Sequence, residues 1–148
     1  MHKVLRTVGC TAAAVAGVLL TAGPAAAANW SPVQTSSRWH CTRTDEHAYV
    51  RQVSFQACYI ALPQTKKQVV LVVRNDGPGP VSIQGIIDNI DGSETLCAQS
   101  TLNAGFTRGC FGHFTPTTCN RGVGYATLIV NGRSDSMPTP RVRDCDDS

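Results

Sequence analysis

Charged and aromatic residues are both scarce in this chain. Of its 148 residues, 16% are charged and 6% are aromatic, whereas about a quarter of an average globular domain is charged. The hydrophobic fraction of 42% still suffices for a core, which excludes an intrinsically disordered protein. The length excludes an α/β barrel and a two-domain dinucleotide enzyme, so we expect one domain.

An apolar run long enough to span a membrane is also missing. The longest run, Val8–Leu20, follows two basic residues and precedes a series of alanines that ends at Ala28. This is the three-part pattern of a secretory signal peptide. We therefore expect residues 1–28 to be cleaved after Ala28 and the mature protein to be secreted. Lipidation at Cys10 is a weaker alternative, because that cysteine precedes the apolar run instead of following it.

The chain has no strong surplus of one charge sign. The formal net charge is +3, and without residues 1–28 the remaining 11 Lys and Arg against 10 Asp and Glu leave +1. That balance provides no electrostatic footprint for nucleic acid or for an anionic lipid surface. We expect no nucleic-acid partner, and no membrane contact after processing.

Cysteine motifs for metal binding are missing. No two cysteines have C-x-x-C spacing, and His40, His47 and His113 lack ligand spacing, which argues against a zinc site. The mature chain holds an even number of cysteines, and in an exported protein this predicts disulfides. We expect three bonds: Cys97–Cys110, Cys41–Cys58 and Cys119–Cys145.

The first of these pairings has a geometric argument. If Asn103 and Ala104 are the central residues of a turn, Cys97 and Cys110 face each other across two antiparallel strands, within reach of a bond. A turn of a different length shifts this register. The other two pairings join the nearest remaining cysteines, although six cysteines allow fifteen connectivities.

Helical periodicity is absent after the first 28 residues. Apolar residues alternate with polar ones, or run uninterrupted, in short stretches bounded by turn residues, which predicts an all-β, antiparallel β-sandwich with six to seven strands. A small closed barrel is the main competitor. We expect a flexible polar arm at 29–40 and a single domain at 41–148. The expected strands span 48–61, 68–74 (apolar on both faces), 81–90 (with Gly85 as a bulge), 94–102, 106–114 and 123–130.

The segment Val70–Ser82, with its Asn75-Asp76-Gly77 turn, and the later Asp91-Gly92 turn resemble a strand–N-x-G–strand signature. That signature is found in bacterial immunoglobulin-like adhesion-related modules. The whole chain is also similar to small secreted actinobacterial proteins that have no assigned activity. The resemblance implies an immunoglobulin-like sandwich and carries over no catalytic residue.

Signatures of catalysis are missing too. The chain has no G-x-S-x-G turn, and its three mature histidines are scattered at positions that we expect to be exposed. An even set of oxidised cysteines leaves no thiol nucleophile. We therefore assign no catalytic residue and no cofactor, and a small hydrolase with an unrecognised site is the enzymatic alternative.

Three acidic residues gather in the segment DNIDGSE. Asp88, Asp91 and Glu94 are weak candidates for a calcium loop or for a carboxylate pair that hydrolyses glycosides, but they do not match the full calcium-loop pattern. An Asp-Gly hairpin turn with solvated acids explains the same residues. We favour the turn.

Three of the four phenylalanines lie in the segment 105–114. Regular alternation places Phe111 and His113 on one face of a strand, and Phe106 and Cys110 on the other. These rings either fill the core, which the usual burial of Phe favours, or contact a carbohydrate or a protein. Trp30 and Trp39, in or beside the polar arm, are better candidates for surface contacts.

The segment 115–122 predicts an extended loop next to Cys119. Small exported inhibitors present such a rigid loop to a protease, and Arg121 would suit a trypsin-like pocket. The other interpretation is an ordinary connection between strands.

We therefore expect a secreted, non-catalytic binding or envelope-associated module. Its partner would be an unidentified extracellular protein or polysaccharide, and inhibition of an extracellular hydrolase through residues 115–122 is the alternative. The candidate binding residues are Trp30, Trp39, Phe111, His113, Phe114 and Arg121.

Overall fold

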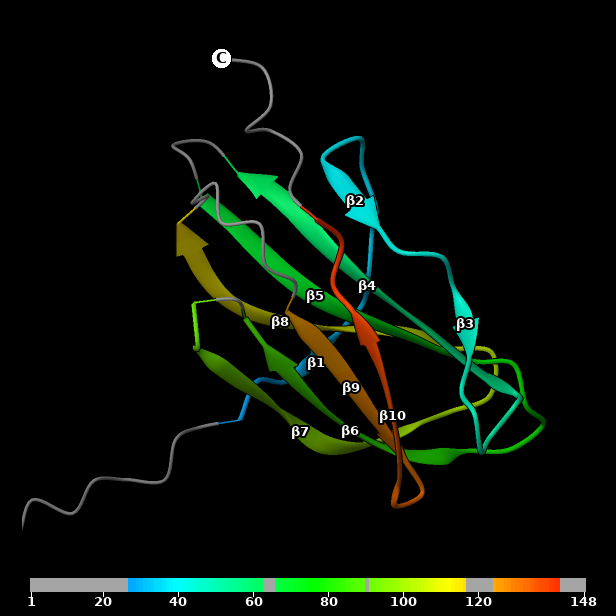
Figure 1. Cartoon of the computed structure of the whole chain (residues 1–148). Helices are drawn as coiled ribbons and strands as arrows, with labels where there is room; N and C mark the ends of the chain where they lie inside the picture. Colours follow the sequence, from blue (N-terminus) through cyan, green and yellow to red (C-terminus); the bar gives the residue numbers. More distant parts are fainter. Residues whose placement is uncertain (1–26, 63–65, 90, 117–123, 142–148) are drawn as a thin grey trace, which may run out of the picture.

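The computed structural model describes residues 27–62, 66–89, 91–116 and 124–141, and every regular element in these ranges is a β-strand (Figure 1). The all-β prediction is confirmed. Three strands of two or three residues come first, and seven strands of at least six residues follow. They are β1 (Trp30–Ser31), β2 (Trp39–Cys41), β3 (Asp45–Glu46), β4 (Val53–Leu62), β5 (Lys66–Asn75), β6 (Val81–Asp88), β7 (Glu94–Leu102), β8 (Thr107–Pro116), β9 (Tyr125–Val130) and β10 (Arg133–Pro138).

The strands form two separate antiparallel sheets that face each other (Figure 1). The six-stranded sheet has the order β1-β8-β5-β4-β2, with β3 also paired to β4, and the four-stranded sheet has the order β10-β9-β6-β7. Among the described strands no ladder joins the two sheets into a ring. The sandwich-like layering is therefore confirmed, and the competing barrel is wrong.

The main core lies between the two sheets. Along β4, Val53, Phe55 and Ala57 are buried and alternate with less buried residues, as the period of two in the sequence predicts. From the same sheet, β5 adds Val69, Leu71 and Val73 to this core. The four-stranded sheet supplies the facing side chains, which are Ile83, Ile87, Leu102, Ala126, Leu128, Val130 and Met137.

Strand β5 is buried on both of its faces. Val69, Leu71 and Val73 belong to the main core, whereas Val70 and Val72 belong to a second cluster on the outer face of the six-stranded sheet. All five are at most 6% exposed. The prediction of a strand covered on both sides is confirmed.

Residues 29–40, expected to form a polar arm, contain β1 and the first two residues of β2. Between these strands the chain crosses the outer face of the six-stranded sheet. There Val33 packs on the second cluster, and a Cβ on Gly109 would lie 2.7 Å from the Val33 Cγ2 atom.

Asn75 organises the loop that follows β5. Its side chain is fully buried, and Nδ2 donates to the carbonyl oxygens of Gly79 at 2.8 Å and Leu102 at 3.0 Å. The Asn75 Oδ1 atom accepts from the Gly77 backbone N–H at 2.9 Å. The breaker cluster of the sequence is therefore a loop, as predicted, with one buried amide at its centre.

Strand β10 is an element that the sequence pattern does not predict, because its residues RSDSMP show no apolar alternation. It forms because Asn131 and Gly132 take φ values of +49° and +78°, which suit a two-residue hairpin turn between β9 and β10.

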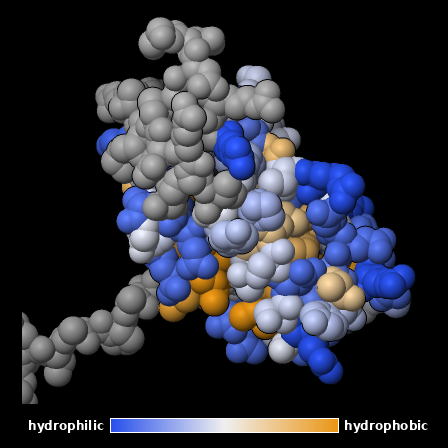
Figure 2. Space-filling model, viewed as in Figure 1, coloured by the Kyte–Doolittle hydropathy of each residue, from blue (hydrophilic) through white to orange (hydrophobic). Residues whose placement is uncertain are grey.

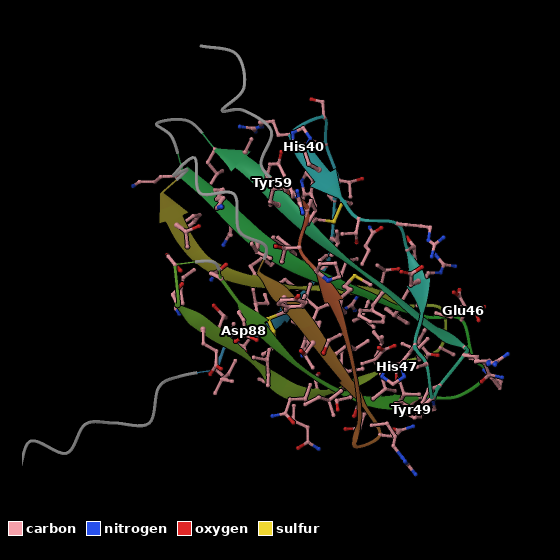
Figure 3. The ribbon with its side chains drawn as sticks, in the orientation of Figure 1. His40, Glu46, His47, Tyr49, Tyr59 and Asp88 are labelled. Atoms are coloured by element: carbon pink, nitrogen blue, oxygen red, sulfur yellow. A yellow bond between two sulfur atoms is a disulfide. The ribbon has the colours of Figure 1, made fainter. Side chains whose placement is uncertain are left out.

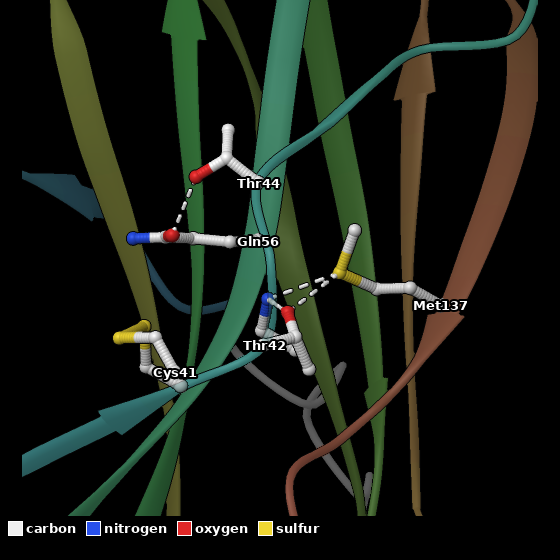
Figure 4. Close-up of a disulfide and its surroundings, with 7 residues drawn as sticks. Cys41, Thr42, Thr44, Gln56 and Met137 are labelled. Carbon is white, nitrogen blue, oxygen red and sulfur yellow. Dashed lines mark hydrogen bonds between the residues drawn. A yellow bond between two sulfur atoms is a disulfide. The ribbon is translucent and has the colours of Figure 1, made fainter.

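Met137 of β10 fastens this strand to the opposite sheet (Figure 4). Its buried sulfur accepts hydrogen bonds from the Thr42 Oγ1 hydroxyl at 3.3 Å and from the Ala57 backbone N–H at 3.1 Å. A nearby bond from Thr44 Oγ1 to Gln56 Oε1, 2.7 Å long, ties the connection between β2 and β3 to β4. The β2–β3 connection is thus held by side chains where the ladder is interrupted.

Two of the three expected disulfides lie in the described residues, Cys41–Cys58 and Cys97–Cys110. Cys119 and Cys145 fall outside those residues. The Cys97–Cys110 pairing is confirmed, but the geometry expected for it is wrong, because Cys97 lies in the four-stranded sheet and Cys110 in the six-stranded sheet. Residues 103–106 carry the chain from one sheet to the other, so this bond joins the two layers across the core.

The register between β6 and β7 shifts beside Gly85, where a bulge is expected, but the extra residue lies in β7, because the two steps from Ile83 to Gly85 are opposite the three steps from Ser100 to Cys97. A Cβ on Gly85 would lie 2.7 Å from Leu71 Cδ2 and 3.2 Å from the Cys97 sulfur. Glycine therefore makes room for the disulfide between the sheets. Within the described residues no helix has the length and apolarity that a membrane crossing requires.

Candidate binding face

The outer face of the six-stranded sheet carries an apolar cluster of its own. Cys58, Val70 and Val72 form its buried base, and four partly buried side chains pack around them. Those four are Val33, Trp39, Ile60 and Phe111. An outer sheet face of a sandwich is ordinarily polar, so a second apolar cluster in this place needs an explanation.

A bulge in β8 adds Phe114 to this cluster's face. Phe111 lies opposite Val70 and Phe114 lies opposite Gln68, so three steps along β8 correspond to two along β5. Directly opposed residues share a face, and Gln68 and Val70 are two apart, which places both phenylalanines on the outer face. Regular alternation does not hold across the bulge. The argument that placed Phe111 and His113 on one face therefore does not apply, and Phe111 shares its face with Phe114.

Trp39 reaches the same face from the edge strand β2. It lies opposite Ile60, and its ring meets Phe111 edge to face with 6.1 Å between the centroids. The Cys41–Cys58 disulfide, two residues away, fastens β2 to β4. The tryptophan is therefore attached to a braced edge strand.

One row of side chains crosses four strands of the sheet. Trp39, Ile60, Gln68 and Phe114 are opposed in sequence across β2, β4, β5 and β8, a distance of about 14 Å at about 4.8 Å per strand. Phe114 is 63% exposed, whereas the other three are partly buried. We call Trp39, Ile60, Gln68, Phe111 and Phe114 the aromatic face.

Gln68 is the polar member of the aromatic face. Its Nε2 donates to the carbonyl oxygen of Gly112 at 2.9 Å, within the bulge. This bond orients the carboxamide between the aromatic rings. The aromatic face thus combines rings with a fixed amide, and the exposed Lys66 lies beside it, two residues before Gln68 on the same side of β5.

The other candidate binding residues lie elsewhere. Trp30 is opposite Cys110 and packs on the main core, and its Nε1 donates to the Ala98 carbonyl oxygen at 2.7 Å. His113 is exposed in the bulge, where its backbone N–H donates to Thr95 Oγ1 at 3.1 Å. Arg121 and most of the 115–122 loop lie outside the described residues.

The three acidic residues around the β6–β7 turn are all exposed. Asp88 and Glu94 are exposed and directly opposed at the ends of the two strands. Asp91 accepts from the Ser93 hydroxyl at 2.7 Å and from the Ser93 backbone N–H at 3.0 Å. These bonds lower the pKa of Asp91 below its ordinary value, and Lys67 contributes to the same shift. In the part of the chain that the structure describes, no three His, Cys, Asp or Glu side chains form a metal-binding group.

The expectation of three exposed histidines is wrong for His47, which is fully buried. Its Nε2 lies 3.1 Å from the Arg133 carbonyl oxygen, and its Nδ1 accepts from the N–H groups of Tyr49 and Val50 at 3.3 Å each. Those contacts place the proton on Nε2 and make the ring a structural link. A histidine in a charged and polar segment carries no sequence signal of this role.

His40 stacks on Tyr59 with 4.7 Å between ring centroids, at the opposite end of the molecule from His47 and Tyr49 (Figure 3). Asp88 lies apart from both pairs. The side of the molecule on which β9 and β10 lie is largely hydrophilic, with smaller apolar areas (Figure 2). Among its exposed apolar side chains is Tyr125, which is 53% exposed on the four-stranded sheet.

No protein family model, no curated protein and no solved structure matches this chain.

Proposed function

We propose that this protein is an exported, non-catalytic binding module whose aromatic face binds a neutral polysaccharide of the extracellular space or the cell envelope. The observation that carries the proposal is the convergence of Trp39, Phe111 and Phe114 on one outer sheet face. Trp39 comes from β2 and both phenylalanines come from β8, far away in the sequence, and the β8 bulge brings Phe114 to that face.

The chemistry of the aromatic face favours a glycan without charge. Pyranose rings present C–H groups on their faces, which pack on aromatic side chains, and hydroxyl groups at their edges, which bond to amides. The face supplies rings at Trp39 and Phe114 and the oriented amide of Gln68 between them. None of its five members is ionisable, so contacts to sugar rings there need no charge. The exposed Lys66, two residues before Gln68 on the same side of β5, is the residue through which an anionic glycan would gain an ion pair.

The remaining chemistry supports binding without catalysis. General acid–base catalysis needs titratable groups that meet at a substrate, usually in a cleft. Asp88 and Glu94 lie on an open sheet surface, and His40 and His47 lie at opposite ends of the molecule.

Export is the second part of the proposal. The two disulfides of the structure fit an oxidising compartment, and residues 1–28 have the pattern of a cleavable signal peptide. We propose a third bond, Cys119–Cys145, and an immunoglobulin-like arrangement of the two sheets.

The test is binding of the purified mature chain to neutral and to charged polysaccharides. Co-sedimentation with insoluble cellulose and chitin, and titration with soluble neutral oligosaccharides, should detect binding to at least one neutral glycan. Phe114→Ala should weaken that binding by about tenfold, the equivalent of about 1.4 kcal/mol. Tyr125→Ala is the matched control, since it removes an exposed ring from the other sheet.

Equal loss in both variants, or binding to anionic glycans alone, would contradict the role of the aromatic face. Failure to bind any glycan, together with saturable and Phe114-dependent binding to one extracellular protein, would replace the polysaccharide by a protein partner.

A further inference from the structure

The segment Ala28–Ser31, which we call the N-terminal strap, lies over the disulfide that joins the two sheets. Ala28 is paired with Cys97 of β7 in a parallel bridge, and Trp30 is paired with Cys110 of β8. The strap therefore contacts both half-cystines, one in each sheet. Cys97 is 1% exposed and Cys110 is fully buried.

Ala28 provides most of the strap's backbone bonding to β7. Its N–H donates to the Leu96 carbonyl oxygen at 2.7 Å, and its own carbonyl oxygen accepts from the Ala98 N–H at 2.8 Å. The Trp30 indole adds a bond to the Ala98 carbonyl oxygen at 2.7 Å. Ala27, one residue earlier, is exposed.

The alanine run contains the A-x-A form of a signal peptidase site at two positions. A cut after Ala27 follows Ala25-Ala26-Ala27, and a cut after Ala28 follows Ala26-Ala27-Ala28. The sequence pattern led us to expect the second cut, but the residues fit both.

We propose that cleavage occurs between Ala27 and Ala28, so that the mature chain begins at Ala28. This inference rests on the export part of the proposed function. A chain beginning at Asn29 would leave the Leu96 carbonyl and the Ala98 N–H without their strap partner at a sheet edge. A chain beginning at Ala28 keeps both bonds, and its new ammonium group still donates to Leu96.

The first test is the intact mass of the protein exported from a secreting bacterial host. The expected mass is that of residues 28–148 with its cysteines oxidised. A product that begins at Asn29 would overturn the inference and leave export standing. A product that retains Met1 and remains in the cells would overturn both the inference and the export proposal.

The second test compares refolded chains that begin at Ala27, Ala28 and Asn29. Mass tagging of free thiols in dithiothreitol follows reduction of Cys97–Cys110. Reduction should be several-fold faster for the chain that begins at Asn29, because the strap no longer covers Cys97. The chain that begins at Ala27 is the control and should match Ala28, since Ala27 is exposed. Equal rates for Ala28 and Asn29 would overturn the role of Ala28.

Discussion

At the scale of single residues, Lys67 conflicts most with its surroundings. It is only 7% exposed, on the inner face of β5, opposite the buried Thr115. Burial lowers the pKa of Lys67 below its ordinary value, while the Asp91 carboxylate acts in the opposite direction. The charged ammonium is thus held in the folded protein at a cost in stability.

Replacement of this lysine by an apolar residue should stabilise the protein at neutral pH. We expect Lys67→Met to raise the free energy of unfolding by about 1 kcal/mol, because it removes the cost of burying a charge. The folded pKa lies below the unfolded one, so the cost is present below the folded pKa and disappears as the pH rises to the unfolded value. The advantage of the variant should therefore shrink as the pH approaches 10.5.

Urea unfolding of both proteins from pH 7 to pH 10.5 measures this difference. Lys66→Met is the control, since Lys66 is exposed. A gain from Lys67→Met that stays constant over the whole pH range would contradict a charge effect.

At the scale of the elements, the sequence predicts strands well where burial dictates the side-chain pattern. The six strands expected from alternation and apolar runs correspond to β4 through β9, with ends that differ by a few residues. The stretch Val69–Val73 predicts its double burial because every residue is apolar. Strand β10 is missed because pairing through the Asn131-Gly132 turn, rather than its own composition, makes it a strand.

The aromatic face could be predicted only in part. Trp39, Phe111 and Phe114 were candidates from residue type, but their common face depends on the bulge opposite Val69. A bulge reflects how two strands pair, and the sequence of one strand does not contain that register. The Cys97–Cys110 pairing is right while its expected hairpin geometry is wrong, because the sequences of two consecutive strands do not state whether they join the same sheet.

The three-residue strand β2 depends on its disulfide. We expect Cys41→Ser with Cys58→Ser to lower stability by about 2–4 kcal/mol and to loosen Trp39 from Phe111. Placed in a Trp30→Phe background, the double variant should show Trp39 emission shifted to longer wavelength, because water reaches the ring. The disulfide-intact Trp30→Phe protein is the control, and an unchanged emission maximum would contradict the bracing role of the bond.

At the scale of the whole molecule, two disulfides do different work. Cys41–Cys58 ties neighbouring strands of one sheet over a sequence separation of 17 residues, whereas Cys97–Cys110 ties opposite sheets over 13. Chain entropy alone favours the longer loop slightly. Cys97 and Cys110, however, also fill the core beside Gly85 and Leu71.

Loss of the bond between the sheets should therefore cost more than loss of the bond within one sheet. We expect Cys97→Ser with Cys110→Ser to lower the free energy of unfolding by about 3–5 kcal/mol, because two buried hydroxyls and a defect in the main core add to the lost cross-link, whereas in the other pair Cys58 is buried and Cys41 is exposed. Guanidinium unfolding of both double variants measures the order. A Cys41→Ser and Cys58→Ser variant that is less stable than the Cys97→Ser and Cys110→Ser variant would contradict this order. It would mean that the length of the closed loop affects stability more than packing of the core does.

Strand β8 packs on the core with one face and presents side chains to solvent with the other, and its extra residue makes the registers of the two faces independent. On one side of that residue, Cys110 serves the interior; beyond it, Thr115 is again buried, so the interior register resumes within a few residues. The side chain of Phe114 is 63% exposed and is therefore not needed to pack the core. A lineage, or an engineer, can exchange this side chain to change the contacts offered to the proposed ligand while the scaffold that presents it stays the same.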